Sequence, residues 1–132
     1  MRKRTKARQI ALQFLYQIDL RSDEVLDQQS DFITSTESCT EVKKYALELI
    51  NGCRNYWSSI NDAITKVAKN WDLSRMAVVD RTILRIAVYE LLYRKDVPQK
   101  VVINEAINLG KRFSTEHSGA FINGILDNLK KM

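Results

Sequence analysis

The first eight residues carry positive charge that could neutralise the phosphates of a nucleic acid. Tyr16 follows at helical spacing, on the side of the predicted helix that faces away from its apolar stripe. An exposed aromatic ring can stack on an unpaired base, which suits single-stranded RNA better than duplex DNA. A frayed, solubilising terminus beside an ordinary surface tyrosine has the same composition, so composition alone leaves both interpretations open. The basic residues are Arg2, Lys3, Arg4, Lys6 and Arg8, with no acid among them.

Two carboxylates, Asp80 and Glu90, fall among apolar residues of one predicted helix. An unpaired charge is costly to bury, so each of them must find a partner. We expect Glu90 to accept the backbone N–H groups that open the helix after Pro98, and Asp80 to complement the dipole of its own helix. For Asp80, a role in surface recognition stays equally open. Ten residues of helix separate the two acids by about 15 Å, which is too far for a shared acid/base site.

Motifs that would indicate an enzyme are missing from the sequence. The single histidine, His117, has neither a recognisable nucleophile motif nor metal-ligand spacing around it. The sequence contains no GxxxxGK(S/T) phosphate loop and no GxGxxG dinucleotide motif. We therefore expect no catalysis, no cofactor and no bound metal. His117 itself is expected to be a solvated or capping residue, with a part in a binding surface as the alternative.

The elements that must position these residues are helices. Only four of the 132 residues are glycine and one is proline, and no clean period-2 alternation marks a strand. Apolar residues at 79–93 lie almost all the way round one helix, which must therefore have other helices against several of its sides. Only Arg81, Thr82 and Arg85 form a narrow polar strip on that helix.

Helical periodicity predicts an all-α fold of six or seven helices. Before the central helix, the spacing marks a helix at about 6–20, a short one after 22–24, and one or two helices between 42 and 71. Two more follow it, one after Pro98 and one that ends near Leu129. They form an N-terminal group at about 1–70 and a C-terminal group at about 74–132. The link between the groups is too short for two domains, so residues 1–132 are expected to form one.

The composition favours a reducing compartment and gives no sign of a membrane anchor. Cys39 and Cys53 form no CxxC motif and are expected to remain reduced thiols. Gln9, Gln13 and Gln17 interrupt the apolar run after the basic start, so no signal-peptide core exists there. No stretch approaches the roughly 20 apolar residues of a membrane span. The sequence therefore predicts a cytoplasmic protein, and the net charge of +5 favours an anionic partner.

Three segments carry a specific pattern: KARQIALQFLYQIDL at 6–20, DRTILRIAVYELLYRKDVPQKVVINEAINLGKRFS at 80–114, and FINGILDNL at 121–129. They closely resemble the NusB family of bacterial transcription antitermination factors. The resemblance spans nearly the full chain and is weakest over 21–70. Its most specific parts are LRIAVYEL, DVP, INEAI and FINGILD at these spacings. The resemblance implies an all-helical, NusB-like fold of two packed helical bundles.

The resemblance also implies a function for the chain. It would bind the boxA element of nascent RNA, mainly from ribosomal RNA operons, together with ribosomal protein NusE. NusE would dock on the C-terminal group, and the pair would help assemble an antitermination complex on RNA polymerase. The family's RNA-binding positions correspond in this sequence to Arg2, Lys3, Arg4, Lys6, Arg8, Tyr16, Asp80, His117 and Phe121.

Two other functions stay open from the sequence. The same fold occurs as the N-terminal RNA-binding domain of ribosomal RNA methyltransferases, so the chain could be an accessory module of such an enzyme. It could also be a protein-interaction scaffold that never touches RNA. Because the sequence ends at Met132 without a catalytic domain, we expect a standalone antitermination factor. Some members of the family pair through the basic helix, so both a monomer and a homodimer stay open.

Overall fold

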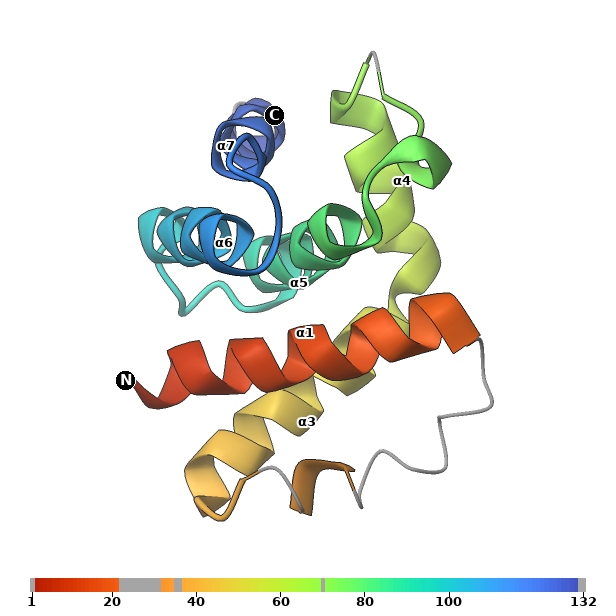
Figure 1. Ribbon diagram of the computed structural model, residues 1–132. Helices are drawn as coiled ribbons and strands as arrows, with labels where there is room; N and C mark the ends of the chain where they lie inside the picture. The colour runs from red at the N-terminus through yellow and green to blue at the C-terminus, as the bar shows by residue number, and fades with distance from the viewer. Residues whose placement is uncertain (1, 22–31, 35–36, 70, 131–132) are drawn as a thin grey trace.

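The computed structural model describes residues 2–21, 32–34, 37–69 and 71–130, and all of its regular elements are helical. The predicted all-α fold is thereby confirmed (Figure 1). The short second helix that was predicted after residues 22–24 lies outside the described residues, except for a helical turn at 32–34. The elements are α1 Lys3–Arg21, α3 Thr40–Asn55, α4 Trp57–Val67, η2 Leu73–Arg75, α5 Val78–Tyr93, α6 Gln99–Phe113 and α7 Ser118–Lys130.

Helix α5 is the central helix, as its sequence predicts. Every side chain from 82 to 91 is buried. Helices α1, α3, α4, α6 and α7 all contact α5, which explains why its apolar residues surround the whole helix. Figure 1 shows α5 above α1 and α3, with α6 on its left, α4 on its right and α7 higher up.

The two groups of helices share one continuous apolar core, which runs from Ala7 in α1 to Leu126 in α7. In the lower part of Figure 1, α1 packs along α3, and in the upper part α6 packs along α7. Helix α4, which the sequence places in the N-terminal group, packs more extensively on α5 and α7 than on α3. The boundary between the groups therefore lies near Tyr56, between α3 and α4, rather than near residue 70.

The polar strip on α5 joins this helix to α1 and α4. Two nitrogens of Arg81 donate to the two carboxylate oxygens of Asp19, at 2.7 and 2.9 Å. Arg85 donates to the same carboxylate at 3.0 Å and to the side-chain oxygen of Asn61 at 2.9 Å. Its guanidinium carbon also lies 4.1 Å from the centroid of the Trp57 ring. Asp19 thus binds two arginines of the central helix and holds the end of α1 in place.

Asp19 should make the fold sensitive to acid. Burial raises the pKa of its carboxyl group, but hydrogen bonds and positive charge from Arg81 and Arg85 outweigh burial and lower the pKa below the usual 3.8. Such a carboxylate stabilises the fold above its unfolded pKa, and this contribution is lost as the pH falls through the folded pKa. We expect Asp19→Asn to cost about 1–3 kcal/mol of unfolding free energy near neutral pH.

Urea titrations of both proteins near neutral pH and near about pH 3 would measure this contribution. The difference in unfolding free energy between wild type and Asp19→Asn should shrink at the lower pH, because the Asp19 carboxyl of the unfolded chain takes up a proton there before the folded one does. A difference of the same size at both pH values would contradict the assignment.

None of the described helices is long and apolar enough to cross a membrane.

Candidate nucleic-acid interface

Helix α1 begins at Lys3, and the carbonyl oxygen of Arg2 accepts a hydrogen bond from the Lys6 backbone N–H at 3.0 Å. Its core-facing side is buried from Ala7 to Leu15 at helical spacing, which fixes the opposite side as the outer one. No acidic residue lies in its first turn. Cations at a helix N-terminus oppose the helix dipole and cost stability, whereas an anion bound there is favoured. An anion placed near the first turn of α1 would therefore be favoured.

Four of the basic residues, Arg2, Lys3, Arg4 and Lys6, lie at the surface, where a phosphate can reach them. The Lys3 ammonium lies 3.0 Å from Glu41, and both side chains are largely exposed, at 59% and 73%. An ion pair as open as this one contributes little and can exchange for another anion. The Lys6 ammonium lies 2.7 Å from the carboxylate of Glu37. Arg2 is exposed and makes no ion pair within the described part of the chain.

Arg8 lies in the core instead of on the outer surface. Its side chain is only 3% exposed. Its Nε and Nη2 donate to the two carboxylate oxygens of Glu90 at 2.8 and 2.7 Å, and its Nη1 donates to Glu105 at 3.2 Å. The structure therefore corrects the prediction that Arg8 contacts phosphate: its guanidinium is occupied by two carboxylates of α5 and α6. A buried guanidinium needs such partners, and Glu90 lies 82 positions further along the chain.

Glu90 also differs from its prediction. The N-terminus of α6 after Pro98 receives no side-chain cap, so Glu90 does not accept those N–H groups. Besides the Arg8 guanidinium, Glu90 accepts a hydrogen bond from the Tyr45 hydroxyl of α3 at 2.5 Å. Burial and this carboxylate raise the pKa of Tyr45 well above its usual value, so the hydroxyl keeps its proton. The Arg4 guanidinium carbon lies 4.7 Å from the centroid of the Tyr45 ring. These contacts hold the start of α1 against α3 and α5.

Tyr16 is half-buried and borders a hollow of about 290 Å³, which we call the Tyr16 hollow. The other residues around it are Leu12, Gln13, Val79 and Phe113. A largely apolar hollow with an aromatic ring from α1 and another from α6 can receive the flat face of a base. The sequence predicts an exposed Tyr16 on the outer side of α1, whereas in the structure its side chain is half-buried where α1 borders α5 and α6.

A second hollow, of about 360 Å³, opens between α1 and α6. On α1 it uses residues of the same side as Tyr16, including Arg2 and Gln9. The α6 side was not anticipated from the sequence, because exposed polar residues on a helix show no periodic signal of their own. Its lining residues are Arg2, Thr5, Gln9, Val101, Asn104, Glu105, Asn108, Leu109 and Arg112.

The three remaining predicted RNA-binding residues lie beyond α1. Asp80 is only 7% exposed, next to Val79 of the Tyr16 hollow, and its Oδ1 accepts no hydrogen bond within the described residues. The His117 side chain is 87% exposed, just before α7. Phe121 is half-buried and packs edge-on against Trp71, with ring centroids 5.2 Å apart. Trp71 is itself 52% exposed.

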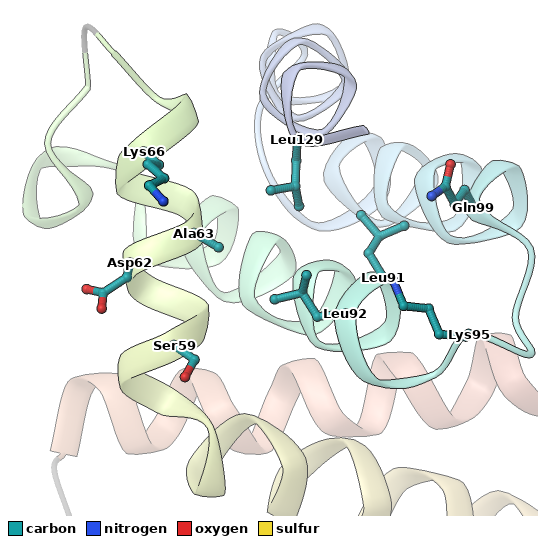
Figure 2. A pocket seen from close by; sticks show the side chains of 9 residues that line it. All are labelled: Ser59, Asp62, Ala63, Lys66, Leu91, Leu92, Lys95, Gln99 and Leu129. Atoms are coloured by element: carbon teal, nitrogen blue, oxygen red, sulfur yellow. The ribbon is translucent and has the colours of Figure 1, made fainter. Parts of the chain in front are cut away.

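Another hollow of about 360 Å³ lies between α4, α5 and α7 (Figure 2). Leucines form its apolar part, and the charged residues come mainly from α4 and the end of α5. Ser59 lines the hollow, and His117, the single histidine of the sequence, is not among the lining residues. An apolar centre within a charged rim is typical of protein docking. The lining residues are Ser59, Asp62, Ala63, Lys66, Leu91, Leu92, Lys95, Gln99 and Leu129.

The chain is similar to known proteins over nearly its whole length. The NusB family model matches residues 5–131. A transcription antitermination protein NusB from Anaeromyxobacter dehalogenans is 52% identical over 126 residues, which cover 95% of this chain and 88% of that protein. The structure of T. maritima NusB gives a TM-score of 0.87 at 39% identity, with 97% and 90% of the two chains covered. A structure of antitermination factors NusB and NusE in complex with dsRNA gives 0.87 at 27% identity, with 99% and 98% covered.

Proposed function

Because this chain belongs to the NusB family, we propose that it is a transcription antitermination factor that binds RNA together with ribosomal protein NusE. The observation that carries the proposal is the outer side of α1, where exposed cations precede Tyr16 and its hollow. Cations for phosphates and an aromatic ring for a base are the two parts that a single-stranded RNA site needs. The solved complex of NusB and NusE with dsRNA supports the same pair of partners.

The proposal includes the RNA element and the place of NusE. As the family resemblance implies, the RNA is boxA of nascent ribosomal RNA, and the assembly forms on RNA polymerase in the cytoplasm. We place NusE on the C-terminal helices, where the hollow between α4, α5 and α7 combines leucines with a charged rim. The chain itself contributes binding and no catalysis.

Fluorescence anisotropy of a labelled boxA RNA, titrated with this chain in the presence and absence of NusE, tests the proposal. We expect tighter binding to boxA than to a scrambled RNA of the same composition, and a further gain when NusE is present. Equal, salt-sensitive binding to both RNAs would contradict sequence-specific recognition and leave nonspecific electrostatics. The absence of any binding would favour a protein-interaction scaffold instead.

Replacing Lys3 and Arg4 together by alanine should make RNA binding less dependent on salt. Each phosphate contact on a single strand contributes roughly 0.7 to the slope of log K against log salt, so the slope should fall by about 1–2. The buried Arg8 is left intact because its loss would disturb the fold. The double variant Lys66→Ala with Lys69→Ala, measured without NusE, removes the same charge at the end of α4, which lies away from the start of α1 (Figure 1), and should keep the slope. Equal slopes for all three proteins would remove Lys3 and Arg4 from the interface.

A further inference from the structure

The hollow between α1 and α6, which we call the α1–α6 groove, has the parts of a nucleotide site. Its volume of about 360 Å³ falls within the range of small-ligand sites, roughly 300–1,000 Å³. Arg2, Thr5 and Gln9 of α1 line one side, and α6 supplies the other. Except for Arg2, none of these residues is among the RNA-binding positions that the sequence predicts.

Three side-chain amides line the groove with unused hydrogen-bonding capacity. Gln9, Asn104 and Asn108 make no side-chain hydrogen bond to any other residue within the described ranges. Each amide offers two N–H donors and one carbonyl acceptor. Asn and Gln use this donor–acceptor pair on the edge of a base, most commonly adenine. The amides are therefore suited to reading the edge of a base.

The charge of the groove suits a phosphodiester chain. Arg2 and Arg112 are exposed at its walls, and neither forms an ion pair in the part of the chain that the structure describes. The one acid, Glu105, is already paired: it accepts hydrogen bonds from the buried Arg8 guanidinium and from the Thr5 hydroxyl. Two free cations beside a neutralised carboxylate leave a net positive site, which attracts the phosphates on either side of a base.

The α1–α6 groove and the Tyr16 hollow lie along the same side of α1. Adjacent residues of α6 line the two sites: Arg112 lines the α1–α6 groove, and Phe113 lines the Tyr16 hollow. Along α1, Gln9 and Tyr16 are two helical turns apart, or about 10 Å. A protein segment would need apolar anchors in the groove. Of the two apolar residues that line it, Val101 is 40% exposed and Leu109 only 4%. These features favour RNA over a protein as the occupant.

We infer that the α1–α6 groove binds one nucleotide of the RNA, close to the nucleotide stacked at Tyr16, and reads its base through Asn104 and Asn108. Arg2 and Arg112 hold the adjoining phosphates. The inference rests on the proposed RNA-binding function and extends it, because it assigns base preference at one position of the RNA to side chains of α6.

The double variant Asn104→Ala with Asn108→Ala tests this inference against a set of boxA RNAs in which each base is replaced in turn. For the wild-type protein, we expect that replacing the base at one position of the RNA, the position bound in the groove, weakens binding roughly 5- to 150-fold. The double variant should lose the preference at that position and keep it at all others. Both asparagines are exposed, so thermal unfolding should change little. The matched control Asn55→Ala with Asn123→Ala removes exposed asparagines of α3 and α7 and should keep the whole pattern.

The outcomes separate this inference from the proposed function. If the wild type prefers boxA and the double variant keeps every base preference, the groove does not read a base and the inference alone is overturned. If the double variant keeps the base preferences but binds NusE less tightly, the groove is a protein surface, which overturns the inference as well. If the wild type shows no preference for boxA, the proposed function and the inference both fail.

Discussion

Replacing Glu90 by alanine is expected to lower the free energy of unfolding by about 3–5 kcal/mol, the cost of removing one partner of a buried ion pair. Its two carboxylate oxygens accept hydrogen bonds from the Arg8 guanidinium at 2.8 and 2.7 Å, and one also accepts from the Tyr45 hydroxyl at 2.5 Å. The paired side chains are 3% and 1% exposed. Without Glu90, Arg8 stays buried with Glu105 as its one remaining acid, and Tyr45 loses its acceptor.

Denaturant titration followed by circular dichroism would measure this cost. The control Glu41→Ala removes the exposed partner of Lys3 and should change stability little. The double variant Arg8→Met with Glu90→Leu leaves neither charge in the core, so it should recover much of the lost stability and stay measurable if Glu90→Ala fails to fold. A loss below about 1 kcal/mol for Glu90→Ala would contradict the structural role of the pair.

Helix α5 shows how much of the fold follows from sequence. Apolar residues at 79–93 predict a central helix, and the structure contains it at Val78–Tyr93 with contacts on several sides. Periodicity reports which sides of a helix are apolar, because this depends only on spacing along one element. It carries no information on which other helix covers each side. For this reason α4 was grouped with the N-terminal helices, although it packs mainly on α5 and α7.

The basic start of the chain shows how much of the site does not follow from sequence. Five cations without an acid correctly indicate an excess of positive charge, but their order along the chain does not show that Arg8 binds Glu90 in the core. On α6, Asn104, Asn108 and Arg112 were missed because solvent-facing polar residues look alike whether or not they line a groove. Their position opposite α1 becomes evident only when α6 is packed in place.

The variant Tyr16→Ala is expected to weaken boxA RNA binding by about 1–3 kcal/mol, or roughly 5- to 150-fold. The ring borders the Tyr16 hollow beside Val79 and Phe113, where the face of a base can stack on it. Tyr16→Phe keeps the ring and removes the hydroxyl, so it should retain most of the affinity if stacking is the main contribution. Fluorescence anisotropy of both variants at one salt concentration, together with thermal unfolding, would measure the effect.

A salt series distinguishes stacking by Tyr16 from a wider disturbance of α1. Removing a ring releases no counterion, so the slope of log K against log salt should be the same for Tyr16→Ala and wild type. A lower slope for Tyr16→Ala would mean that phosphate contacts at the start of α1 are lost as well. Unchanged affinity in Tyr16→Ala would instead make Tyr16 a packing residue, and base contacts would then have to come from other residues along the α1–α6 groove.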